Sequence, residues 1–194
     1  MANINFDQLF YIDSGTLQPA ESGIALPTYG NFGGVGYSQG VFVLDPDLAQ
    51  FDPAPVDALD QLFQVHDQAY AVATATAEQS VADVELIRGI GALDQLDPEA
   101  SLYGGAATLA IIMKLEANGS LGLLTQEELV GTTTEALQDI ERGLAGFSWG
   151  EISEAVDWMN DVADAPAFEN ADVSNSLGND SPVLQGLMSD LLWI

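Results

Sequence analysis

The segment PVDALDQLFQVHDQAY, from Pro55 to Tyr70, constrains the fold more than any other part of this chain. Its apolar residues recur at steps of three and four, which predicts an amphipathic helix. Leu59, Leu62, His66 and Tyr70 share one face of that helix, because residues three and four apart lie above one another. The face therefore combines core residues with two side chains that can do chemistry.

His66 is the only histidine of the chain, and Asp67 follows it directly. A neutral imidazole is a base near pH 7, and a carboxylate is a ligand for hard cations. Asp67 lies about 100° round the helix from His66, so the two side chains point in neighbouring directions. The pair points to attack by water assisted by a metal ion. The common alternatives are a structural core histidine and an ordinary solvated acid, and the surrounding sequence decides against them.

A glycine-rich stretch, YGNFGGVG from Tyr29 to Gly36, precedes the predicted helix. Glycine clusters most often mark simple turns. Glycine-dense backbone can also bend several carbonyls toward one centre, and calcium takes six to eight oxygen ligands. The helix that follows favours the second interpretation.

The order of the glycine loop, PVDALD and HDQAY resembles the calcium loop and histidine-aspartate helix of the secreted phospholipase A2 family. The resemblance covers Tyr29 to Gly36 and Pro55 to about Arg88, a minority of the chain. It implies one cofactor, Ca²⁺, bound by the backbone carbonyls of Phe32, Gly34 and Gly36 and by the carboxylate of Asp67.

The resemblance also implies an enzyme, a calcium-dependent hydrolase of the sn-2 ester of glycerophospholipids. His66 would take a proton from the attacking water, while calcium and the amide of Gly34 stabilise the oxyanion. This chemistry needs a base, an electrophile and an oriented water, but no protein nucleophile.

Family architecture places an aspartate that orients the imidazole on a second, antiparallel helix. Asp83, within VADVELI, is the best candidate, because its apolar neighbours suggest a buried position and a buried acid needs a partner. Asp94 is the alternative, and Tyr70 is expected to hydrogen-bond to whichever aspartate is used. We place the turn between the two helices at residues 78–80.

The chain departs from the family pattern in two ways. It has no cysteine, whereas most secreted relatives carry several disulfides, so cysteine-free bacterial and viral members are the closer comparison. A chain of 194 residues can fold by packing alone, because a domain of this size buries roughly 70% of its unfolded surface. The second departure is an insertion, Tyr37 to Ala54, with a short strand expected at Val41 to Leu44 and a lid over the substrate as one possible role.

Three basic residues against 30 acidic ones give a formal charge of −27. Binding to nucleic-acid phosphates is therefore excluded as a partner class, and a zwitterionic glycerophospholipid surface is easier to approach than an anionic one. Acidic, cysteine-free composition is typical of exported bacterial proteins, which suggests an extracellular protein or a domain of a larger exported one. Met1 to Gln8 does not form a conventional signal peptide, and the longest apolar run, Ala106 to Met113, is too short to cross a bilayer.

We expect a mainly α fold: two antiparallel active-site helices with a glycine-rich calcium loop, and additional C-terminal helices on the same core. We expect residues 1–100 to form the phospholipase-like region and residues 101–194 an additional helical region of the same compact domain. Ala2 to Pro27 is irregular or strand-like. The further helices are expected at 102–116, from a capping box of Thr125 and Glu128 to about 144, at 151–164, and at 182–194.

Two function classes remain. The first is the calcium-dependent lipid esterase, and the second is a non-catalytic calcium-binding or interaction domain that keeps the scaffold. The retained His66 favours the first, because only chemistry requires that base. An acidic mimic of nucleic acid would explain the charge but not the motif.

Asp57 and Asp60 suggest either a second ion or, preferably, solvated acids at a helix start, where the dipole favours them. Oligomeric state is left open.

Overall fold

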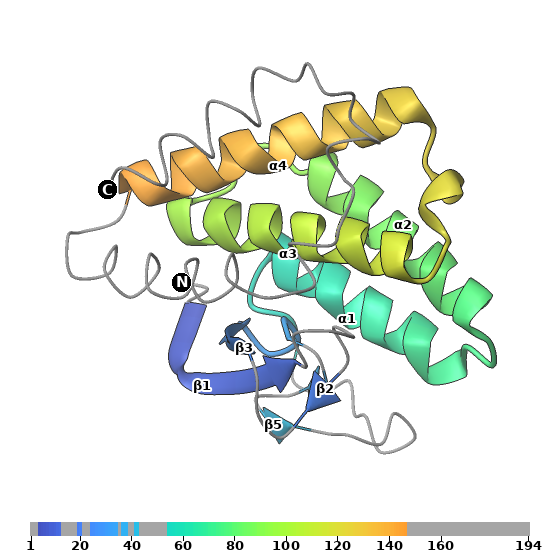
Figure 1. Ribbon diagram of the computed structural model, residues 1–194. Coiled ribbons are helices and arrows are strands. Elements are labelled where there is room, and N and C mark those ends of the chain that lie inside the picture. The colour runs from blue at the N-terminus through green and yellow to red at the C-terminus, as the bar shows by residue number, and fades with distance from the viewer. Residues whose placement is uncertain are drawn as a thin grey trace.

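A computed structural model describes residues 4–12, 19–20, 24–34, 36–38, 41–42 and 54–146. This part of the chain is mainly helical, as the sequence predicts, and it also contains a three-stranded and a two-stranded antiparallel sheet (Figure 1). The helices are α1 (Ala58–Val72), α2 (Thr76–Gly91), α3 (Pro98–Ala117), the 3₁₀-helix η2 (Leu121–Leu123) and α4 (Gln126–Gly146). The strands are β1 (Ile4–Ile12), β2 (Pro19–Ala20), β3 (Ile24–Tyr29), β4 (Tyr37–Ser38) and β5 (Val41–Phe42).

Strand β1 is the centre of a three-stranded sheet with the order β2-β1-β3, and both neighbours are antiparallel to it. The register between β1 and β3 is irregular between Asn5 and Leu9, opposite Thr28 and Pro27. Proline has no N–H to donate to a ladder, so an irregularity beside Pro27 costs the sheet little. The strand-like character expected for residues 2–27 is confirmed where the chain is described, and β5 confirms part of the strand expected at 41–44.

Helices α1 and α2 form an antiparallel pair, but the turn between them lies earlier than predicted. Helix α1 ends at Val72 and α2 begins at Thr76, so the turn is not at residues 78–80. Glu78 belongs instead to the first turn of α2, where its carboxylate accepts hydrogen bonds from the backbone N–H and the hydroxyl of Thr74. Glu78 thus reaches back to the residue before the N-cap Ala75, and its negative charge in the first turn favours a helix that begins at Thr76.

Helices α3 and α4 pack along each other, and α3 lies between α4 and the three-stranded sheet (Figure 1). Helix α3 begins at Pro98, four residues before the predicted start, because the side chain of Asp97 caps it by accepting from Ala100 N. The predicted capping box at α4 is present in both directions, at 2.8 and 3.1 Å. At Gly105 the two backbones meet, since an added Cβ would lie 2.5 Å from the carbonyl oxygen of Ala136.

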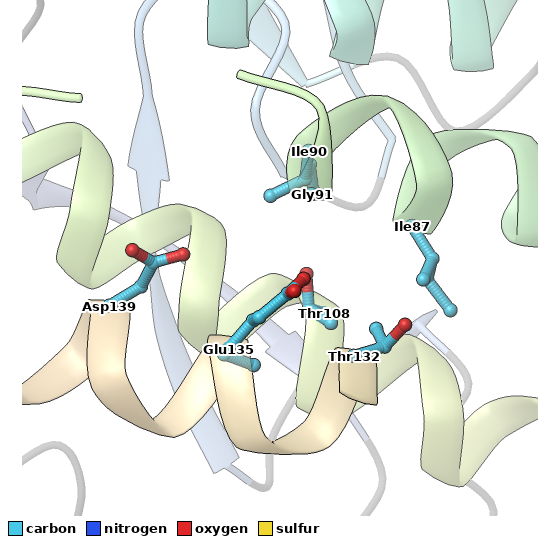
Figure 2. A pocket seen from close by; sticks show the side chains of 8 residues that line it. Ile87, Ile90, Gly91, Thr108, Thr132, Glu135 and Asp139 are labelled. Atoms are coloured by element: carbon cyan, nitrogen blue, oxygen red, sulfur yellow. The ribbon is translucent and has the colours of Figure 1, made fainter. Parts of the chain in front are cut away.

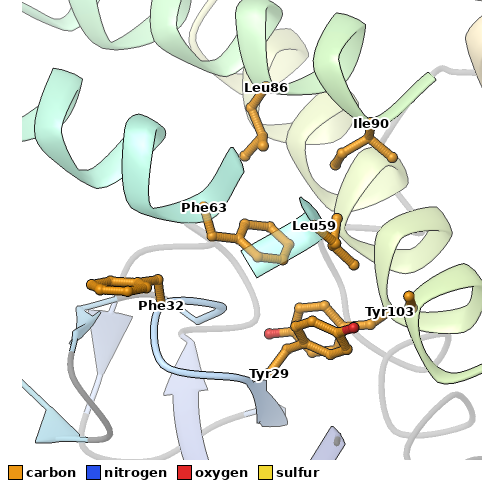
Figure 3. Close-up of a cluster of buried hydrophobic side chains, with 8 residues drawn as sticks. Tyr29, Phe32, Leu59, Phe63, Leu86, Ile90 and Tyr103 are labelled. Carbon is orange, nitrogen blue, oxygen red and sulfur yellow. The ribbon is translucent and has the colours of Figure 1, made fainter. Parts of the chain in front are cut away.

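The largest apolar cluster joins the sheet to the helices (Figure 3). The ring of Tyr29 lies 5.0 Å from the ring of Tyr103, and Phe63 meets Tyr103 edge-on at 5.6 Å. The hydroxyl of Tyr103 donates to the backbone carbonyl of Pro27 at 3.0 Å. The buried members are Tyr29, Phe32, Leu59, Phe63, Leu86, Ile90, Ala100 and Tyr103. This core therefore fixes the glycine loop, which begins at Tyr29, against α1.

The remaining sequence predictions lie outside the described residues. They are the helices at 151–164 and 182–194 and the lid role of the insertion between residues 43 and 53. No helix among those described, all within residues 54–146, has the length and apolar character needed to cross a membrane.

Candidate active site

Asp83 is the centre of a buried polar network. Its side chain is fully buried, and its Oδ1 lies 2.9 Å from Nε2 of His66 and accepts a hydrogen bond of 2.6 Å from the hydroxyl of Tyr70. Helix α1 supplies His66 and Tyr70, which lie four residues apart on one face, and α2 supplies Asp83. The expected pairing of His66, Tyr70 and Asp83 is therefore present, whereas Asp94 is exposed and no contact joins it to His66 in the described structure.

Lys114 of α3 completes this network, and the sequence analysis missed it. Its Nζ lies 3.2 Å from both carboxylate oxygens of Asp83 and donates to the hydroxyl oxygen of Tyr70. The available signal was the position of the chain's one lysine, in the otherwise apolar run IIMKL. A lone cation inside an apolar helix stripe predicts a buried acid opposite it.

The network determines which nitrogen of His66 carries the proton. Burial raises the pKa of Asp83, but the contacts with His66, Lys114 and Tyr70 outweigh burial and hold that pKa below its usual value. An ionised carboxylate only accepts hydrogen bonds, so Nε2 of His66 must be the donor. The Nδ1 lone pair of the neutral ring is then available to accept a proton on the side of Asp67.

Asp67 lies beside that free nitrogen without bonding to it. Its Oδ1 is 3.8 Å from Nδ1 of His66, too far for a hydrogen bond. Burial raises the pKa of Asp67 to about 6, although His66 acts in the opposite direction. For His66, burial lowers the pKa, and the two neighbouring carboxylates outweigh that and raise it. A cation beside such a carboxylate would stabilise its charged form, which burial disfavours.

The glycine loop folds back on the end of β3. Tyr29 and Gly33 exchange two backbone hydrogen bonds of 2.7 Å, and Gly30, Gly34 and Gly36 have φ values of 55°, 149° and 64°. Residues with a Cβ rarely adopt such angles, so the three glycines are needed for this path. The loop is a built structure and not merely a break between two elements.

Asp60 holds the loop to α1, which corrects the expectation of a solvated acid. It is fully buried, and its carboxylate accepts hydrogen bonds from the backbone N–H groups of Asn31, Phe32 and Val56 at 2.8 to 3.1 Å. Burial raises its pKa, and these three N–H groups act against that. The N–H groups of Asn31 and Phe32 lie outside the β-ladder, so they need this acceptor in the core.

Asp57 also holds the glycine loop to the start of α1. Its side chain caps the helix by accepting from Asp60 N at 2.8 Å and also accepts from the hydroxyl of Tyr29 at 2.5 Å. The two acids of PVDALD thus tie the first turn of α1 to the glycine loop. Their contacts within the protein leave the idea of a second ion without support.

The oxygen donors implied for calcium are of the right chemical type. Three are backbone carbonyls, of Phe32, Gly34 and Gly36, and one is the Asp67 carboxylate, a set of hard ligands that suits Ca²⁺. The Gly33 N–H donates to Tyr29, so the Phe32 carbonyl of the same trans peptide points away from β3. The Gly34 carbonyl accepts from Tyr37 N at 3.1 Å and keeps a second lone pair. Within the described residues no three acidic or histidine side chains gather as a metal site, and this donor set does not require that.

A separate small hollow lies between α2, α3 and α4 (Figure 2). Thr108 contributes a buried hydroxyl without a hydrogen-bond partner, while Glu135 and Asp139 contribute carboxylates. Asp139 is already paired with Arg142 at 2.7 Å. None of the His66 network lines this hollow, so it is not part of the candidate site.

No protein-family model, curated protein or solved structure matches this chain.

Proposed function

We propose that this protein is a calcium-dependent hydrolase of phospholipase A2 type, which cleaves the sn-2 ester of glycerophospholipids with a water activated by His66. The observation that carries the proposal is the hydrogen bond from His66 to the buried Asp83, because it leaves the Nδ1 lone pair free beside Asp67. A neutral imidazole held by a carboxylate in one tautomer is the arrangement that general-base catalysis needs.

The proposed reaction has two proton transfers through His66. Nδ1 takes a proton from water as the water oxygen bonds to the ester carbonyl carbon. The resulting imidazolium is stabilised by Asp83 through its Nε2–H. When the tetrahedral intermediate collapses, the bond to the glycerol oxygen breaks, and Nδ1 returns its proton to that oxygen. The products are a fatty acid and a lysophospholipid.

The oxyanion requires positive partners. Asp67 and the backbone carbonyls of Phe32, Gly34 and Gly36 would hold the calcium ion. When bound, calcium would supply Lewis-acid stabilisation of the negative carbonyl oxygen of the substrate. The amide of Gly34 is the proposed protein donor to the same oxygen. Asp60 and Asp57 act indirectly, by holding the glycine loop against α1.

The test is release of fatty acid from phosphatidylcholine vesicles, with calcium and with chelator, by the parent chain and by His66→Gln. We expect release that needs calcium and falls at least about 100-fold in His66→Gln, because the loss of a general base typically costs 10²–10⁴ in rate. Gln68→Ala is the matched control: it alters an exposed residue two positions along the same helix.

Two results would contradict the proposal. Equal release by the parent chain and His66→Gln would show that another group does the chemistry. No release from any of several headgroups, together with measurable calcium binding, would favour the non-catalytic calcium-binding scaffold.

A further inference from the structure

Lys114 contacts both carboxylate oxygens of Asp83, including the Oδ1 that lies against the candidate catalytic base, His66. Its side chain is about a quarter exposed, while that of Asp83 is fully buried, so the ammonium closes the network toward solvent. The ammonium also lies 4.5 Å above the centre of the Tyr70 ring, a cation–π distance. Three helices therefore meet at Asp83: α1 through His66 and Tyr70, α2 through Asp83 itself, and α3 through Lys114.

The positive charge of Lys114 matters because no other side chain of the network supplies one to Asp83 while His66 acts as a base. Tyr70 is neutral, its pKa is raised by burial and by Asp83, and His66 must be neutral to act as a base. A buried carboxylate without a cation tends to take up a proton. A protonated Asp83 would donate its O–H, and His66 would have to accept at Nε2 and carry its hydrogen on Nδ1, where the attacking water needs a lone pair.

We propose that Lys114 is a positioning residue: its contact with Asp83 keeps that side chain an acceptor and thereby holds His66 in the tautomer with hydrogen on Nε2 and the lone pair on Nδ1. This inference rests on the proposed function only for the identity of the reaction that uses the tautomer. The tautomer itself is a property of the resting protein and is measurable without substrate.

A purely structural role makes a different prediction. If Lys114 only joins α3 to α1 and α2, its replacement lowers stability and leaves the His66 tautomer unchanged. Stability alone therefore does not separate the two roles, whereas the hydrogen position on the imidazole does.

The experiment uses the full chain labelled with ¹⁵N-histidine, which gives a single imidazole because His66 is the only histidine. Long-range ¹H–¹⁵N spectra, recorded in chelator at a pH where the ring is neutral, report which nitrogen carries hydrogen. The variants are Lys114→Met, Lys114→Gln as a second neutral variant, and Lys114→Arg, which keeps the charge. The control is Arg88→Met, which removes an exposed cation paired with Glu128 at 2.9 Å, away from His66.

We expect the parent chain, Arg88→Met and Lys114→Arg to hold the Nε2–H tautomer, and the neutral variants to lose its dominance. On vesicles, the neutral variants should lose at least tenfold in kcat with KM within about twofold, and Lys114→Arg should recover most of it. Urea unfolding establishes which variants are folded, and Lys114→Gln is the decisive one if Lys114→Met is not.

Three results are decisive. An unchanged tautomer in a folded neutral variant overturns the inference, even if activity falls. A changed tautomer in Lys114→Gln but also in Arg88→Met overturns it too, since any lost cation would then suffice. A changed tautomer confined to the neutral Lys114 variants, in a parent chain that hydrolyses no lipid, supports this inference and refutes the proposed function.

Discussion

Asp60 and Asp83 are both fully buried carboxylates, yet the protein satisfies them in different ways. Within the described residues, the partners of the Asp60 carboxylate are backbone N–H groups of the loop and of Val56, and burial leaves its pKa raised. Asp83 has two side-chain partners that can carry positive charge, His66 and Lys114, and its pKa is lowered. Both carboxylates are hydrogen-bonded, but only one is paired with a cation.

This difference separates Asp60, which holds the glycine loop in place, from Asp83, which is bonded to the imidazole of His66. Backbone N–H groups bring partial charges that organise a loop but do not cancel a full negative charge. The positive charges of a lysine and a histidine cancel that negative charge, and the carboxylate in turn favours the charged forms of these two side chains. The surroundings of a buried aspartate, more than its burial, therefore indicate whether it holds the fold or tunes a neighbour.

The largest expected effect is on stability, from Asp60→Ala. This change leaves the buried N–H groups of Asn31 and Phe32 without an acceptor, so we expect a loss of about 3–5 kcal/mol in the free energy of unfolding. Asp83→Ala should cost less, about 1–3 kcal/mol, because its partners His66 and Lys114 are partly exposed and can turn to water. Urea unfolding of both variants measures the contrast. An equal or larger loss for Asp83→Ala would break the comparison.

The next effect concerns the close approach of the glycine loop to Asp60. A Cβ at Gly30 would lie 2.5 Å from Cγ of Asp60, at a φ of 55°. We expect Gly30→Ala to cost about 2–4 kcal/mol, from the left-handed backbone and the displaced carboxylate together. Gly119→Ala is the matched control, since Gly119 has a φ of 66° with no neighbour within 4 Å. It should cost only about 1–2 kcal/mol in the same urea experiment. Equal losses would show that the contact with Asp60 contributes nothing.

The smallest effect is expected from Tyr70→Phe. The change removes one of the hydrogen bonds to Asp83, while His66 and Lys114 remain bonded to it. Stability should fall by about 1 kcal/mol, and hydrolysis by less than tenfold. Paired measurements of urea unfolding and vesicle hydrolysis check this. A loss of activity as large as that of His66→Gln would mean that the hydroxyl of Tyr70 takes a direct part in the reaction.

The sequence predicts much of this site because the necessary signals are local. The four-residue spacing of His66 and Tyr70 places them on one helical face, and a short turn brings Asp83 back to that face. The predicted capping box at Thr125 is also local, and it is present. The shared helical face and the capping box need only the helical period and chemistry within a few residues, whereas the pairing of His66 with Asp83, 17 residues away, was implied by the resemblance to the phospholipase A2 family.

The missed features depend on partners distant in sequence. Asp60 was expected in solvent because its helix position gives no sign that the glycine loop, about 28 residues earlier, lies against it. Lys114 is 31 residues from Asp83, and no periodicity connects them. The turn after α1 was misplaced for a smaller reason, since Glu78 serves equally well in a turn and in a first helical turn. Tertiary contacts decided the first two, whereas the start of α2 depends on the local contact between Glu78 and Thr74.

The hydrogen bond from Tyr103 to Pro27 has a consequence for the order of folding events. It joins residues 76 positions apart, whereas the pairing of α1 with α2 closes a loop of only 17 residues between His66 and Asp83. Short loops close at lower entropic cost, and contacts between distant residues form later. We therefore expect the helical half of the site to assemble before the sheet and its glycine loop dock. A newly made chain would then possess an oriented histidine some time before the glycine loop has taken its place against α1.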